Sequence, residues 1–126
     1  MSNILISTES RFPINRKLLK QAVENFLAEQ KINLDIEVSI SIVGDRKMRN
    51  LNKQYRQHDN TTPVLTFSQT EGQPLVSTPD NILRLGDIII SYPQAILTAT
   101  EENKMVDQVL SEFVTHGLKN LLGLSS

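Results

Sequence analysis

The clearest chemical pattern in this chain lies in its last segment, HGLKNLLGLSS. His116, Asn120, Gly123 and Ser126 stand at the offsets of the metal-binding pattern HxxxHxxGxxH. In that pattern two histidines one helical turn apart face the same metal, the glycine lets the chain leave the helix, and a third histidine returns from the turn. Three imidazoles leave one coordination position for water, which zinc makes acidic enough to hydrolyse an ester or an amide.

Only the first ligand and the glycine of this pattern are present. Asn120 and Ser126 offer neutral oxygen donors, which bind zinc far less well than imidazole does. A lone histidine does not hold zinc tightly, so we expect zinc binding to be weak or absent. On the helical projection His116 lies beside Val109 and Phe113, at the border of the buried face, where a hydrogen bond to backbone or water is the simpler interpretation.

Other residues would have to complete a hydrolytic site. His58 is the only other histidine in the chain, and we interpret it as a surface residue of a loop. Asp59 and Asp87 could supply carboxylates, but nothing in the sequence brings either one to His116. We interpret Asp87 as a structural residue that caps a turn or accepts backbone hydrogen bonds. Gly117 replaces the glutamate that follows the first histidine in metallopeptidases, so no peptidase base is evident.

A second candidate surface is a row of basic residues, called the basic row below: Arg46, Arg49, Lys53 and Arg56. Their spacings of three, four and three residues place them along one side of a helix predicted from Asp45 to about Gln54. Such a row can follow an RNA backbone through salt-dependent contacts with phosphates, or it can be a solvated helix face. Met48, Met105 and the aromatic residues, Tyr55 among them, sit at core spacing.

The composition indicates one ordinary globular domain over residues 1–126. Thirteen basic and fourteen acidic residues give a formal charge of −1, so evidence for nucleic-acid binding must be local. The absence of cysteine excludes disulfides, thiolate metal sites and cysteine nucleophiles, and it fits a reducing compartment. We find neither an apolar run of membrane-spanning length nor a signal peptide, and we expect a cytoplasmic protein.

Alternating strands and helices must position these residues. The periodicity predicts strands over 4–7, 36–42, 64–67 and 85–91 and helices over 16–30, 45–54, 94–101 and 104–122. Apolar and polar residues alternate at 36–42, where we expect an edge strand. The apolar run of LGDIIIS predicts a central strand buried on both faces. Residues 68–84 have no periodicity and are predicted to form a long loop.

These elements predict an α+β or mixed α/β domain. We expect a mixed sheet of about four strands, with the last helix carrying His116 across it. No internal repeat or linker indicates a second domain.

Four segments of the chain together resemble the YbeY endoribonuclease and rRNA maturation family, in the same order and over most of the chain. SISIVGDRKMRNLNKQYRQHD (39–59) is similar to the family's strand and helix with its "LN..YR..D" ending. TTPVLTF (61–67) resembles "PT(D/N)VLSF", LGDIIIS resembles "LGDI.IS", and VTHGLKNLLG resembles "HGxLHLxGYDH". The last two segments and the YR pair are the most specific.

The departures from the family are concentrated at the site. Asn120 stands for the second histidine, Leu124 for the tyrosine, Ser125 for the aspartate and Ser126 for the third histidine; Thr61, Pro63 and Thr66 depart from the strand motif. Family members continue a little beyond the position of Ser126, so a shortened C-terminus is one interpretation.

The resemblance implies a zincin-like core and a zinc-dependent, single-strand-specific endoribonuclease that acts in 16S rRNA 3′-end maturation and ribosome quality control. It also implies an arginine near the substrate phosphate at Arg56, where a guanidinium can bind two phosphate oxygens and stabilise transition-state charge. The expected partner is rRNA or the small ribosomal subunit, not DNA or a membrane. Two interpretations stay open: a hydrolase with a weakly held ion, and a metal-free relative that binds RNA or the ribosome without cutting.

Overall fold

The fold follows the predicted order of strands and helices closely. The computed structural model describes residues 2–9, 11–56, 62–69 and 81–124. Along this part of the chain the elements are β1 (Asn3–Thr8), α1 (Arg16–Glu29), β2 (Asp35–Val43), α2 (Asp45–Arg56), β3 (Val64–Ser68), β4 (Ile82–Ser91), α3 (Tyr92–Glu102) and α4 (Val106–Leu121). Asn15 caps α1, because its side chain accepts from the Leu18 N–H at 3.1 Å. β4 begins at Ile82, earlier than the predicted residue 85.

The strands form one mixed sheet in the order β1-β2-β4-β3, which confirms the predicted mixed α/β domain. β1, β2 and β4 are parallel, and β3 runs antiparallel to β4. The prediction of a central strand at 85–91 is confirmed. The prediction of an edge strand at 36–42 is wrong, because β2 lies between β1 and β4. Its alternation has another cause, namely that one face of the sheet is covered and the other is largely open.

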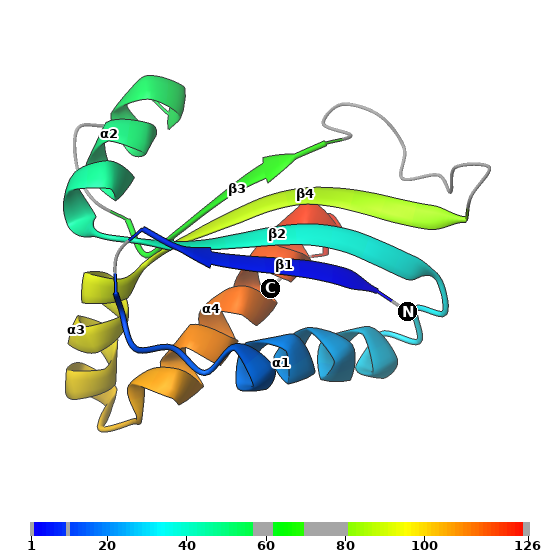
Figure 1. Cartoon of the computed structure of the whole chain (residues 1–126), viewed down its shortest axis with the longest axis horizontal. Coiled ribbons are helices and arrows are strands. Elements are labelled where there is room, and N and C mark those ends of the chain that lie inside the picture. The colour runs from blue at the N-terminus through cyan, green and yellow to red at the C-terminus, as the bar shows by residue number, and fades with distance from the viewer. Residues whose placement is uncertain (1, 10, 57–61, 70–80, 125–126) are drawn as a thin grey trace.

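The covered face packs against α1, α3 and α4, which lie together on one side of the sheet (Figure 1). β2 and β4 contribute Ile36, Val38, Ile40, Ile42, Leu83, Leu85, Ile88 and Ile90 to this core. An apolar stripe along α1 packs against them and consists of Leu19, Val23, Phe26 and Leu27. This single apolar layer holds α4 across the sheet, as the sequence predicted.

Among the described residues, α2 alone covers the opposite face, at one end of the sheet. Met48 of α2 is buried there with Val43 and Leu65, and Ile89 packs against them. Away from α2 the same face carries polar side chains, and Asp87 is exposed. The prediction that residues 85–91 are buried on both faces therefore holds for the part of β4 under α2 and fails at Asp87.

One polar junction fixes where α2 and α3 leave the sheet. The buried Ser91 hydroxyl donates to Asp45 Oδ1 at 3.0 Å and accepts from the Gln94 N–H at 3.2 Å. Gln94 Nε2 also donates to Asp45 Oδ1, at 3.4 Å. Ser91 thus caps α3 and ties the end of β4 to the first turn of α2, which sets the direction of α2.

Candidate functional site

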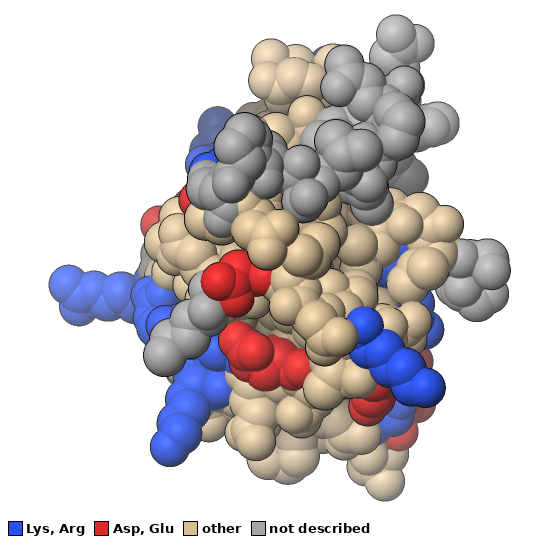
Figure 2. Space-filling model, turned by 90° about the vertical axis from the view of Figure 1, so that its right-hand side faces the viewer, with Lys and Arg blue, Asp and Glu red and all other residues tan. Residues whose placement is uncertain are grey.

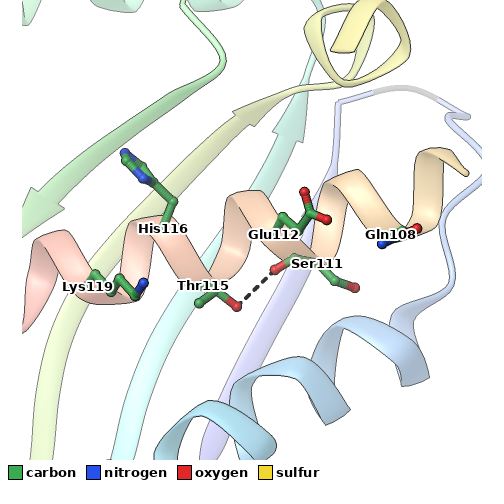
Figure 3. A pocket seen from close by; sticks show the side chains of 6 residues that line it. All are labelled: Gln108, Ser111, Glu112, Thr115, His116 and Lys119. Carbon is green, nitrogen blue, oxygen red and sulfur yellow. Dashed lines mark hydrogen bonds between the residues drawn. The ribbon is translucent and has the colours of Figure 1, made fainter. Parts of the chain in front are cut away.

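His116 lies on α4 at the border of the buried face, as predicted. Val109 is buried and Phe113 partly buried on the same side of the helix, whereas His116 and Asn120 are exposed. Figure 3 shows that His116 leaves α4 on the side that faces β3, and that Glu112 lies one turn before it. The imidazole is therefore accessible to a ligand.

Two hollows meet at His116 and Glu112. The first, of about 480 Å³, runs along α4 and is lined by Gln108, Ser111, Glu112, Thr115, His116 and Lys119 (Figure 3). The second, of about 360 Å³, lies between α4 and the start of β3, where Thr62, Pro63 and Val64 face Glu112, Phe113 and His116. The fold thus brings the segment TTPVLTF beside the segment HGLKN, although they are far apart in the sequence.

Glu112 is engaged by a cation. Both of its carboxylate oxygens accept from Lys104 Nζ at 3.1 Å, and Lys104 also pairs with Glu102 at 3.0 Å. Hydrogen bonds from Lys104 to Glu102 and to Glu112 raise the pKa of Lys104, so it stays charged. A metal ion would have to compete with Lys104 for the Glu112 carboxylate.

The turn that ends α4 keeps the geometry of the metal-binding pattern. Gly123 has a φ of 71°, in the left-handed region that favours glycine. The Leu124 N–H donates to the Lys119 carbonyl at 2.9 Å and the Gly123 N–H donates to the Asn120 carbonyl at 3.2 Å, the pattern of a Schellman turn. The predicted role of the glycine is therefore confirmed.

Gly117 lets α4 approach the sheet closely. A Cβ at this position would lie 2.7 Å from Ile88 Cγ2, closer than real Cβ atoms come. A side chain at this position would require Ile88 or α4 to shift, so the close packing of α4 on β4 favours glycine over the glutamate of the metallopeptidase pattern.

The donor atoms around His116 are few. In the described ranges, no three His, Asp or Glu side chains gather closely enough to hold a metal ion. Asn120 offers an amide one turn after His116. The predictions for Ser126, at the third ligand position, and for His58 and Asp59 fall outside the described residues.

The basic row lies on α2, on the other face of the sheet from α4 (Figure 1). Arg46, Arg49 and Lys53 are exposed, and no hydrogen bond or ion pair occupies them within the described part of the chain. Arg56 is the last residue of α2, and its side chain lies outside the description. His116 and the side chains of Arg46, Arg49 and Lys53 are therefore presented from opposite faces of the sheet.

Sequence reasoning missed an aromatic pair on the open face. Tyr55, predicted to be core, is 55% exposed, and its ring packs edge-on against Phe67 with centroids 5.2 Å apart. Met105, also predicted to be core, is 75% exposed because it precedes α4 at the turn after α3. Asp87 is exposed and no described residue donates to it, so its interpretation as a structural residue stays a prediction. A charged residue within a central strand was the available signal, because such a residue must face the open side.

Charge elsewhere on the surface is mixed. Figure 2 shows the end of the molecule near the N-terminus, where acidic and basic side chains are interspersed. This agrees with the formal charge of −1 and makes the unpaired basic row a local feature. Along the described residues, no helix combines the length and the apolar character needed to cross a membrane.

Comparison with known proteins gives one consistent result. The family described as Endoribonuclease YbeY matches residues 5–125. A protein of that name from Dehalococcoides mccartyi (strain CBDB1) is 33% identical over 129 residues, which cover 96% of this chain and 78% of the relative. Another from Anaeromyxobacter sp. (strain Fw109-5) is 40% identical over 89 residues, covering 71% of this chain and 43% of that protein.

A solved structure is similar over nearly the whole chain. The solution structure of TM1509 from Thermotoga maritima has a TM-score of 0.61 and 29% sequence identity, and the match covers 97% of this chain and 73% of that one.

Proposed function

Because this chain belongs to the YbeY endoribonuclease family, we propose that it is an rRNA maturation factor that acts on single-stranded RNA of the small ribosomal subunit, at the 3′ end of 16S rRNA. The observation that carries this proposal is that the match spans residues 5–125 and includes the segments that meet at His116. The proposed substrate implies a cytoplasmic protein whose partners are rRNA or the small subunit, not DNA or a membrane.

The basic row supplies the proposed contact with the RNA backbone. Arg46, Arg49 and Lys53 are exposed and unpaired among the described residues, so they can meet phosphates without giving up an existing ion pair. Arg56 closes the row at the end of α2. We propose that its guanidinium binds two oxygens of one phosphate, which would fix the position of the strand.

The residues around His116 do not fit a tightly held zinc ion. When bound, zinc would supply an acidic water for hydrolysis. Of the described side chains here, His116 is a good zinc ligand, Asn120 is a poor one, and Glu112 is occupied by Lys104. We therefore infer that this chain retains recognition of RNA without a tightly bound metal.

The second candidate is the zinc-dependent single-strand endoribonuclease activity that the family name implies. Family membership favours it, and it shares the substrate of the first candidate. It requires metal ligands beyond those that the described residues bring to His116.

Zinc content and RNA assays on the same untagged, mildly purified protein separate the two candidates. We expect zinc well below one ion per chain by elemental analysis, and binding of a single-stranded RNA from the 16S 3′ end that a chelator does not change. Near-stoichiometric zinc with cleavage abolished by the chelator would establish the second candidate instead. Failure to bind the RNA under either condition would contradict the proposed function.

A reversion variant is the matched control for zinc content. Asn120→His together with Ser126→His restores the three-histidine pattern on an α4 whose final turn keeps its geometry. We expect this variant to take up zinc that the natural chain does not hold.

A further inference from the structure

The open face of the sheet carries a hollow of about 250 Å³ that is separate from those at His116. One row of side chains crosses it from edge to edge, because the strand registers pair Leu5 with Ser39, Ser39 with Asp87, and Asp87 with Phe67. All four line the hollow, together with Ser68. A flat sheet surface with one aromatic end is the kind of platform on which single-stranded RNA bases stack.

The aromatic end of this row, Phe67, is partly buried and lies beside an exposed tyrosine. Tyr55 of α2 packs edge-on against Phe67 at an interplanar angle of 73°, and over half of its surface stays accessible. The other tyrosine, Tyr92, is buried and stacks on Phe12 with ring centroids 4.6 Å apart. The Tyr55 ring is therefore available to a planar ligand.

Asp87 gives the hollow a specific acceptor. It stands opposite Phe67 in the antiparallel pair, so the two side chains are neighbours on the same face. The nearby Glu37 already pairs with Arg84 at 3.4 Å and accepts from Asn3, whereas no described residue donates to Asp87. An ionised carboxylate accepts hydrogen bonds only, so it favours a ligand edge that is rich in N–H groups.

Guanine has the base edge that fits this acceptor best. Its Watson–Crick edge presents two adjacent N–H donors, which match the two oxygens of one carboxylate. Uracil presents one N–H between two carbonyl oxygens, which the Asp87 carboxylate would repel. Unpaired bases in RNA are commonly read on this edge while they stack on an aromatic ring.

The basic row lies on the same helix as Tyr55. Tyr55 follows Lys53 by two residues and Arg49 by six, so its ring projects from a different side of α2 than these two cations. A strand that contacts these cations through its phosphates would pass around α2 to place a base on Tyr55.

We propose that Tyr55, Phe67 and Asp87 form a subsite for one unpaired guanine of the bound RNA. The base stacks on the aromatic pair, its Watson–Crick edge faces Asp87, and phosphates further along the strand contact the basic row. This inference rests on the proposed function, since it names where the RNA binds and which base is selected.

Tyrosine emission tests the stacking directly. The chain has two tyrosines and no tryptophan, so Tyr92→Phe leaves Tyr55 as the only strong emitter. The probes are a nine-nucleotide oligouridine and the same RNA with guanine at the central position. We expect the guanine RNA to quench Tyr55 emission on binding and to bind about tenfold more tightly than the oligouridine.

Anisotropy of labelled RNA supplies a second readout that does not depend on the Tyr92→Phe background. We expect Tyr55→Ala to lower the affinity for the guanine RNA about tenfold, and Tyr55→Phe, which keeps the ring, to restore it. Leu97→Ala is the matched control, because Leu97 is an exposed apolar residue on α3. Asp87→Asn, which replaces one acceptor by a donor, should bring the affinities for the two RNAs close together.

The outcomes separate this inference from the proposed function. RNA binding that is unchanged by Tyr55→Ala and does not alter Tyr55 emission would overturn the stacking subsite and leave the proposed function standing. Equal affinities of the natural chain for the two RNAs would overturn the selection of guanine. No binding of either RNA would overturn both the subsite and the proposed function.

Discussion

One face of the four-stranded sheet is covered by α1, α3 and α4, whereas within the part of the chain that the structure describes α2 alone covers the other face, at its end. On the covered face Ile40 has no accessible surface, while on the open face Leu5 is 57% exposed. The covered face therefore carries the apolar burial that stabilises the domain. Away from α2 the open face leaves side chains such as Leu5 and Asp87 exposed, so substitutions there remove little packing.

α4 shows the same contrast within a single helix. Gly117, Leu118 and Leu121 are buried against the sheet, whereas His116 and Asn120 are exposed. A change at an exposed ligand position removes metal affinity without leaving a cavity in the core. The fold can therefore persist when the metal ligands change. Membership of the family thus does not by itself imply that a metal binds at His116.

The largest expected effect is a loss of stability on the covered face. Ile40→Ala should lower the free energy of unfolding by about 2–5 kcal/mol, because it leaves a cavity in the central layer. Leu5→Ala, on the open face, should change it by less than about 0.5 kcal/mol. Urea unfolding of both variants measures this difference. Equal changes in the free energy of unfolding would contradict the distinction between the two faces.

The next effect concerns RNA affinity and leaves stability unchanged. Replacing Arg46, Arg49 and Lys53 together by Gln should reduce the magnitude of the slope of log affinity against log salt by about 2, since each contact with single-stranded RNA contributes about 0.7. Anisotropy titrations over a range of salt concentrations measure this slope.

The control for this triple variant removes the same charge elsewhere. Arg11, Lys17 and Lys20 are exposed residues in or before α1. Replacing these three by Gln should leave most of the salt dependence in place. An equal loss in both triple variants would mean that net charge, and not the basic row, binds the RNA.

A smaller effect is expected where α4 touches the sheet. Alanine is the better helix former, yet Gly117→Ala should lower the free energy of unfolding by about 1–3 kcal/mol, because the new Cβ would press on Ile88. In a double-mutant cycle with Ile88→Ala, which removes the opposing atoms, the combined cost should be less than the sum of the single costs. A stabilising Gly117→Ala would contradict the close approach of α4 and β4.

The smallest effect is a pH dependence on the covered side. Burial and, to a lesser extent, the Asp107 carboxylate raise the pKa of Tyr92 above 10.0. Above about pH 10 the unfolded chain loses the Tyr92 proton while the folded chain still keeps it. The contribution of Tyr92 to the free energy of unfolding is therefore complete below about pH 10 and is lost as the pH rises further.

Tyr92→Phe should make the fall in stability above about pH 10 shallower in urea unfolding over that range. The variant also loses the hydrogen bond from Tyr92 to the Pro13 carbonyl, which is 3.2 Å long. That loss lowers stability by a similar amount at every pH below the transition, so only the slope is diagnostic. An unchanged slope would contradict the raised pKa.

Much of the fold could be predicted because its signals are local. The alternation at 36–42 and the stripe of α1 follow from periodicity, and the Asn15 cap follows from residue type. The position of β2 within the sheet could not be predicted. Alternating apolar and polar residues indicate that one face of a strand is open, but they do not distinguish an edge strand from an inner one.

The candidate site was predictable only in part. His116 and Gly123 take their predicted places because the helix and its terminal turn are local structures. The burial of Tyr55 was predicted wrongly, since it depends on how far α2 covers the sheet, which is a tertiary property. The separation of the basic row from His116 likewise depends on the face to which α2 packs.

The most direct test of the central claim is the affinity of the natural chain for single-stranded RNA from the 16S 3′ end, measured by anisotropy with and without a chelator. The account predicts the same affinity under both conditions, because the basic row on α2 binds the backbone without a metal. Loss of binding in the chelator and its recovery on adding zinc would contradict the account and place a required metal in the RNA site.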